Sequence, residues 1–206
     1  MQELRLLYFF AFVCIIAFMR ITKEKTEYHL GNYLWGSCET DAAVNVSLSH
    51  EGCILHALFD VREKELRRMV WEANGPVWTD SCVEIFIKNG NSREYSNFEF
   101  SASGAFLACH GEGRKDRIFY SDDERSAVTD SVSILENSNK SNHWILSASI
   151  DLRKLGIIES TDDEICFNIY KCGDGLKKPH FISLFPISLP SPDFHCPSFF
   201  TCARLV

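Results

Sequence analysis

A tryptophan and two carboxylates lie close together in the run GPVWTDSCVEIF, residues 75–86. Trp78 and Asp80 stand at a turn, and Glu84 follows inside an alternation of apolar residues. On a strand that begins near Asp80, residues four apart share one face, so Asp80 and Glu84 could form the carboxylate pair of a glycoside hydrolase. This spacing is common in strands, and the sequence shows no environment that would activate either carboxylate. We therefore predict that the protein is not an enzyme.

Binding chemistry fits these residues better than catalysis does. Glu84 and Glu99 each interrupt an apolar pattern, and a buried carboxylate is unfavourable unless it is hydrogen-bonded. Trp78 and Tyr170 offer aromatic faces that can stack on a pyranose ring, while carboxylates accept hydrogen bonds from sugar hydroxyls. The pattern favours a carbohydrate site at a sheet surface. The alternative is that both glutamates line the solvated face of an edge strand and that Trp78 caps one end of the fold.

Other chemistries lack their motifs. The sequence has no G-x-S-x-G, Walker, H-E-x-x-H or dinucleotide-binding pattern. Its seven histidines are scattered, and His180 and His195 are neighbours in sequence only. With 21 basic against 28 acidic residues, the formal charge is −7, and no basic run could match a phosphate backbone. We predict no nucleic-acid partner.

Short alternating segments separated by turns predict an all-β protein that would position these residues. Apolar and polar residues alternate around residues 44–48, 83–87, 98–100, 144–150 and 165–169. Helical patterns are confined to residues 63–70 and 151–156. The expected fold is an antiparallel β-sandwich or jelly roll with at most one or two short helices. Residues 112–130 are expected to form a charged, mobile loop.

Nine cysteines occur without a recognisable pairing pattern. None forms a C-x-x-C motif, and the spacings from Cys166 to Cys172 and from Cys196 to Cys202 match no common zinc site. Several precede apolar strand residues, as Cys82 does. We interpret the cysteines as small buried core residues of a protein in a reducing compartment.

The N-terminal segment has an apolar run of fourteen residues, Leu6 to Met19. This run is shorter than the ~20 residues of a membrane-spanning helix but suits a signal peptide. We predict a leader over residues 1–20, either a signal or an anchor, and one domain over residues 21–206. A signal implies the cell envelope or secretion, and otherwise the protein is cytoplasmic; membrane association would come only through an uncleaved leader. The alternatives are a start codon assigned too early and an apolar segment packed on the domain.

Several motifs together resemble the family 9 carbohydrate-binding module and its relatives in bacterial proteins. They are VWTDSCVEIFI, NFEFSASG, EICFNIYKCGD and PSPDFHCPSFF, and the resemblance runs from about Trp35 to the C-terminus. It implies a jelly-roll sandwich that clamps a terminal sugar of an oligosaccharide or polysaccharide between two aromatic rings.

The resemblance also implies roles for individual residues. Trp78 matches the first ring of the clamp, and Phe194 stands where the second is expected. Glu84 matches an acidic residue that bonds sugar hydroxyls. Tyr170 stands where the family carries a glutamine, and Ser191 where an asparagine contributes.

Glu99 departs from the family pattern, because characterised members carry an arginine at that point. A carboxylate cannot make the hydrogen bonds of a guanidinium, so the site would hold a different sugar or none. Two alternatives therefore stay open: a structural or protein-interaction sandwich with a degenerate sugar site, and a haem-binding relative that would use Met69 as an axial ligand. No cofactor is expected, although the family also holds structural calcium, whose ligands we do not match to residues here.

Overall fold

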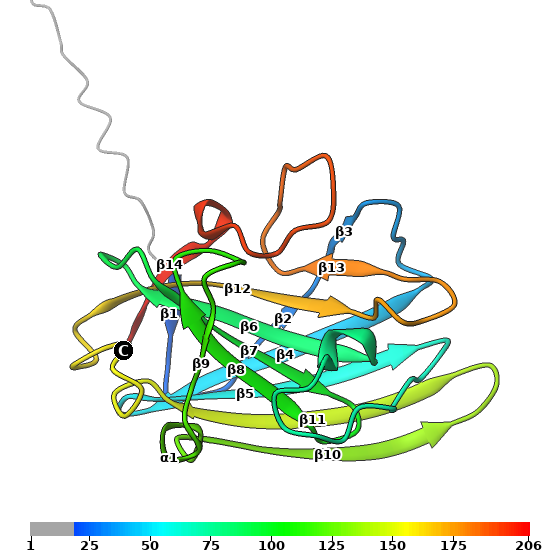
Figure 1. The fold of residues 1–206 in the computed structure, drawn as a ribbon, viewed down its shortest axis with the longest axis horizontal. Coiled ribbons are helices and arrows are strands. Elements are labelled where there is room, and N and C mark those ends of the chain that lie inside the picture. Colours follow the sequence, from blue (N-terminus) through cyan, green and yellow to red (C-terminus); the bar gives the residue numbers. More distant parts are fainter. Residues whose placement is uncertain (1–18) are drawn as a thin grey trace, which may run out of the picture.

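The computed structural model describes residues 19–206 and consists of two β-sheets packed face to face (Figure 1). The main path of the larger sheet runs β1 (Met19–Ile21), β14 (Thr201–Leu205), β12 (Glu164–Cys172), β6 (Cys82–Asn89), β7 (Tyr95–Ser101), β8 (Phe106–Gly111) and β9 (Ile118–Phe119). Two short strands extend it, β13 (Phe181–Ser183) beside β12 and β3 (Asn32–Leu34) beside β13. The smaller sheet runs β10 (Val128–Asn137), β11 (Asn142–Asp151), β5 (Ile54–Glu63), β4 (Ala42–Glu51) and β2 (Thr26–His29).

Neighbouring strands are antiparallel except for β1 and β14, which are parallel. The predicted all-β sandwich is therefore confirmed.

The apolar alternation places one face of each central strand in the core between the sheets. Val83, Ile85 and Ile87 of β6 are fully buried there, as are Trp144 and Leu146 of β11. Because side chains of a strand point alternately to opposite faces, the intervening residues of β6 lie on the outer face of the larger sheet. Apolar burial stabilises the fold by roughly 25 cal/mol per Å² removed from water.

The outer face of the larger sheet carries a second apolar cluster. Cys82, Phe86 and Tyr170 contribute to it from the sheet, and Ile187 and Phe194 contribute from the connection between β13 and β14. This connection, orange to red in Figure 1, passes over the side of the larger sheet that faces away from the smaller one. The larger sheet is thus covered on both faces, and polar residues on its outer face can be buried.

Both predicted helices are wrong. Residues 64–70 after β5 form no regular element, and side chains bind their backbone amides: Ser81 binds that of Arg67, and Asp80 binds those of Met69 and Val70. Residues 151–156 form only a turn.

The α-helix of the described chain is α1 (Asp122–Arg125). It lies inside the predicted charged loop, after β9, and begins with a capping box between Ser121 and Glu124. Two single 3₁₀ turns, η1 (Val77–Thr79) and η2 (Pro197–Phe199), complete the elements.

One pair of cysteines corrects the interpretation of the cysteines as free core residues. Cys166 of β12 and Cys202 of β14 are directly opposed and form a disulfide. Cys82, Cys109 and Cys172 are buried free thiols, as predicted.

The predicted leader falls mostly on residues 1–18, which lie outside the described residues. Met19 and Arg20 belong to β1, which pairs with β14. None of the helices in residues 19–206 is long and apolar enough to cross a membrane.

Candidate functional site

A cavity of about 260 Å³ opens on the outer face of the larger sheet, and we call it the outer cavity. Its lining includes Trp35, Trp78, Glu84, Glu99, Arg117 and Phe194. Strands β6, β7, β8 and β12 supply its floor, η1 supplies one wall, and the connection from β13 to β14 supplies another. Four of the six predicted site residues therefore meet at one cavity.

The strand register brings the two predicted glutamates together at the floor. Glu99 of β7 lies directly opposite Glu84 of β6, which lies directly opposite Tyr170 of β12. Directly opposed side chains in antiparallel strands have Cβ atoms about 4.5–5.5 Å apart. The three residues form one row across the sheet, although 86 positions separate Glu84 from Tyr170 in the sequence.

Trp78 stands at the rim of the outer cavity with 39% of its surface exposed. The adjoining turn is fixed by Asp80, whose buried carboxylate forms an ion pair with Arg67 and accepts hydrogen bonds from the backbone amides of Met69 and Val70. Asp80 is therefore engaged in holding the loop. It is not available as a catalytic partner for Glu84.

Phe194 lies deeper than a clamp residue at a rim would. Its ring stacks on Tyr170, with centroids 4.1 Å apart and planes 5° apart, and its exposed fraction is 9%. Tyr170 is fully buried beneath it, and the Tyr170 hydroxyl donates to the Phe194 carbonyl. Tyr170 thus supports the wall from behind, while Phe194 and the neighbouring Trp35 face the cavity. Ser191 is exposed and lies outside the lining.

The floor carboxylates have few partners for a buried pair. Asn97 donates a hydrogen bond of 2.8 Å to Glu99 Oε1, while Glu99 Oε2 is buried and has no hydrogen-bond partner among the described residues. Burial raises the pKa of Glu84 well above its usual range, and Cys172 and Glu99 raise it further. Burial also raises the pKa of Glu99, to about 7, although Asn97 and Arg117 act in the opposite direction.

Arg117 brings a positive charge to the cavity that the sequence analysis missed. It donates hydrogen bonds to the carbonyls of Gly111 and Cys109 and to Asn97 Oδ1, and its guanidinium lies 4.2 Å from the Tyr95 ring centroid. Its Nε is buried and has no hydrogen-bond partner among the described residues. The sequence feature that could have indicated the position of Arg117 is Gly111, which begins the loop that returns Arg117 to the sheet.

Gly111 makes this return possible. It has a φ of 152°, and a Cβ atom at this position would lie 2.2 Å from the Asp116 carbonyl oxygen. Only glycine tolerates both the backbone angle and the close approach. The turn it permits brings β9 beside β8 and places Arg117 over Tyr95.

His195 lines the outer cavity with an uncharged imidazole ring. Its Nδ1 lies 2.8 Å from the Tyr95 hydroxyl, which is within hydrogen-bond distance. Burial lowers the pKa of His195 to about 4, and the guanidinium groups of Arg117 and Arg114 lower it further. The imidazole is therefore uncharged at neutral pH, so the nearby positive charge comes from the arginines.

Sequence comparison places this geometry in a family. The family model described as carbohydrate-binding family 9 matches residues 17–205. The chain belongs to this family. The resemblance noted from the sequence motifs is thereby confirmed, and the outer cavity lies on a family 9 sandwich. No curated protein matches the chain in sequence.

Solved structures of similar fold include three family members or candidates. A candidate carbohydrate-binding protein from Bacteroides uniformis ATCC 8492 is 28% identical, with a TM-score of 0.79 over 88% of this chain and 87% of that one. A family 9 module from Caldicellulosiruptor kristjanssonii in complex with cellotriose is 10% identical, with a TM-score of 0.56 over 91% and 92% of the two chains. A family 9 module from that organism in complex with glucose is 13% identical, with a TM-score of 0.50 over 91% and 95%. The last two similarities concern the fold alone.

Proposed function

We propose that this protein binds carbohydrate non-covalently in the outer cavity. The observation that carries the proposal is the pair of unmatched polar atoms in residues that line the cavity. Among residues 19–206, Glu99 Oε2 is a buried acceptor without a donor, and Arg117 Nε is a buried donor without an acceptor. Leaving such groups unmatched is unfavourable by about 1–3 kcal/mol each. A sugar hydroxyl can both donate and accept, so one ligand class can satisfy both atoms.

The walls suit a sugar ring as well. The exposed indole of Trp78 offers a face for the apolar side of a pyranose, and Phe194 closes the deeper wall. The volume of about 260 Å³ lies just below the ~300–1,000 Å³ of typical small-molecule sites. This size favours the end of an oligosaccharide or polysaccharide over an internal stretch. Family 9 membership and the cellotriose and glucose complexes of family members support the same ligand class.

Binding without catalysis is part of the proposal. Asp80, the partner that a hydrolytic pair with Glu84 would use, is committed to Arg67 and to two backbone amides. Modules of this family type are generally binding domains without activity of their own. The haem alternative gains no support from Met69, whose side chain is 68% exposed at the surface.

Calorimetric titration with a panel of monosaccharides and oligosaccharides tests the proposal. We expect saturable heat with one sugar class and, in Trp78→Ala, an affinity about 5–10-fold weaker, because one stacking contact contributes on the order of 1 kcal/mol. Trp71→Ala is the matched control, since Trp71 is 64% exposed and lies outside the cavity lining. Equal affinity losses in the two variants, or no saturable binding by the folded protein, would refute the proposal.

A further inference from the structure

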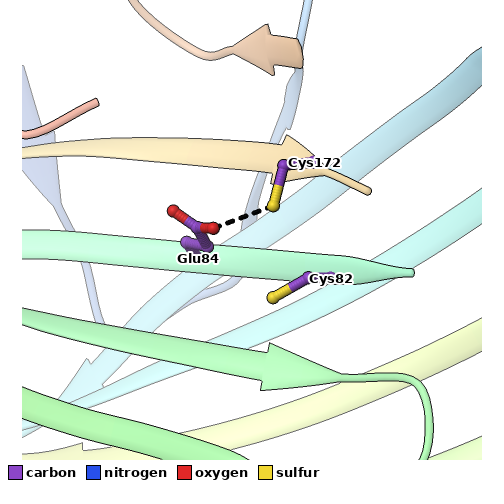
Figure 2. A group of neighbouring side chains, drawn as sticks. All are labelled: Cys82, Glu84 and Cys172. Atoms are coloured by element: carbon purple, nitrogen blue, oxygen red, sulfur yellow. Dashed lines mark hydrogen bonds between the residues drawn. The ribbon is translucent and has the colours of Figure 1, made fainter. Parts of the chain in front are cut away.

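Two thiols and a carboxylate converge at the floor of the outer cavity, and we call them the thiol–carboxylate triad: Cys82, Glu84 and Cys172. Their ligand atoms all lie within 4.8 Å of one another, and all three residues are buried. Cys82 and Glu84 are two apart on β6 and therefore share its outer face. Figure 2 shows the Cys172 sulfur reaching from β12 to the Glu84 carboxylate, where Sγ donates to Oε1 at 2.9 Å.

We propose that the thiol–carboxylate triad is a binding site for a thiophilic divalent cation such as Zn²⁺. Two cysteine sulfurs and one carboxylate oxygen are a donor set that favours Zn²⁺ or Cd²⁺ over Ca²⁺ or Mg²⁺, because soft thiolates select soft or borderline cations. On binding, the thiol protons leave to water and the sulfurs coordinate as thiolates. No oxidant or reductant takes part.

A second observation points to the same ligand. Glu99 stands directly opposite Glu84, is buried, and has an unmatched Oε2. A buried carboxylate oxygen without a partner, beside another buried carboxylate, is expected where a cation completes the site. Glu99 lies outside the group whose ligand atoms converge within 4.8 Å, so it would contribute a neighbouring negative charge and not a direct ligand. Tetrahedral coordination of Zn²⁺ calls for four ligands, of which one can be water.

The position of the triad leaves a path for the cation. Glu84, Glu99 and Cys172 line the outer cavity, whereas Cys82 lies behind them. A cation that enters the cavity can reach Glu84 and Cys172 of the triad without any movement of the sheet. The cation would share the outer cavity with a bound sugar, but its ligands are this chain's own side chains, so its binding can be measured in the absence of sugar.

The comparison with the other cysteine pair of β12 sharpens the proposal. Cys172 and Cys82 are directly opposed in the register, just as Cys166 and Cys202 are. Cys166 and Cys202 form a disulfide, while Cys82 and Cys172 are free thiols and Cys172 turns its sulfur towards Glu84. β12 therefore contributes one cysteine to a covalent cross-link with β14 and another whose thiol donates to Glu84 of β6.

A Cd²⁺ titration of the protein with Cys82 and Cys172 reduced and the Cys166–Cys202 disulfide intact, followed by thiolate-to-cadmium charge-transfer absorbance, tests the proposal. We expect one tight equivalent that excess Zn²⁺ displaces, and binding at least ~10-fold weaker in Cys82→Ala and in Cys172→Ala, since each removes one ligand. Cys109→Ala is the matched control: Cys109 is another buried free thiol that lines the outer cavity but lies outside the triad. The Cd²⁺ affinity of Cys109→Ala should match that of the wild type.

Glu84→Gln guards against misfolded variants, because it keeps both thiols and the side-chain shape. We expect the charge-transfer band to persist with weakened affinity, and circular dichroism to match the wild type. A band that survives undiminished in the Cys82→Ala/Cys172→Ala double variant would overturn the proposal, since exposed thiols would then account for it. The absence of saturable Cd²⁺ binding by the reduced wild type would overturn it as well, even if sugar binding were intact.

Discussion

Glu63 and Glu99 are both buried glutamates, but they differ in their partners. Glu63 lies between the sheets, where Trp144 Nε1 donates to Oε1 at 2.7 Å and Lys171 Nζ pairs with Oε2 at 2.9 Å. His180 Nε2 lies 3.6 Å from the same oxygen. We call Glu63, Trp144, Lys171 and His180 the buried ion cluster. Glu99 lies on the outer face, where one of its oxygens has no hydrogen-bond partner among the described residues.

The difference between the two sites separates stability from binding. In the buried ion cluster, Lys171 from the opposite sheet balances the charge of Glu63 at 2.9 Å, although Glu63 Oε2 and His180 Nε2 form no hydrogen bond with the described residues. The outer cavity retains an unmatched acceptor and an unmatched donor, which a ligand can satisfy. One site should therefore respond to mutation through unfolding, and the other through affinity.

Lys171→Met should reduce stability more than any other substitution in this comparison, because it leaves the charge of Glu63 buried without its cation. We expect the free energy of unfolding to fall by about 3–5 kcal/mol, as measured by urea denaturation. The control is Arg62→Met, which removes a cation whose side chain is 59% exposed and whose partner, Asp60, is 44% exposed. That variant should unfold almost like the wild type. Similar losses in both variants would mean that the buried ion pair contributes no more to the free energy of unfolding than an exposed one.

Glu99→Gln should change sugar affinity and not stability. We expect sugar affinity to fall by about tenfold, because hydrogen bonds to charged groups contribute about 1.5–3 kcal/mol, while the free energy of unfolding does not decrease. Calorimetry and urea denaturation in metal-free buffer provide both values. Glu63→Gln is the counterpart and should lose stability but retain sugar affinity. If Glu99→Gln were the less stable of the two variants, the assignment of roles would be reversed.

The smallest effect concerns pH and His180. Burial lowers the pKa of His180 to about 3, and Lys171 lowers it further, although Asp41 acts in the opposite direction. The unfolded chain, with a histidine pKa near 6.5, therefore binds the proton first, so stability present above pH ~6.5 is lost as the pH falls towards 3.

Unfolding in urea at pH 7 and pH 5 measures this loss. The wild type should lose roughly 1–2 kcal/mol more than His180→Gln, because one proton is worth at most ~1.4 kcal/mol per pH unit. The charged groups facing His180, namely Glu63, Asp41, Lys171 and Lys178, are the same in both proteins. Equal losses would show that other groups control the acid response.

The sequence predicted what depends on local periodicity. The alternation at residues 144–150 and 165–169 placed β11 and β12 correctly because a half-buried strand repeats every two residues. The helix expected at residues 151–156 failed, since one capped turn is too short to distinguish a helix from a turn. Periodicity could not bring Glu84 and Glu99 together, because the register between β6 and β7 decides which residues oppose each other.

Contacts between residues far apart in the chain could not be predicted from the sequence. The partner of Glu63 is 108 residues away, at Lys171, and no local pattern distinguishes this lysine from a solvated one. Arg117 reaches the outer cavity only because Gly111 permits a tight return, and its segment was predicted to be a mobile loop. Tyr170 was chosen as an aromatic residue and Ser191 from its motif position, and neither criterion carries information on depth.

The disulfide between Cys166 and Cys202 has a mechanical consequence. β14 pairs with β12 through residues 201–204, and Cys202 is cross-linked near the start of that strand. A force applied beyond the C-terminal end of β14 would peel Arg204 and Ala203 away and then meet a covalent bond. The load would pass to the backbone of β12 at Cys166, before the row at Tyr170. In the protein with this disulfide formed, tension on β14 would therefore not reach the residues that line the outer cavity.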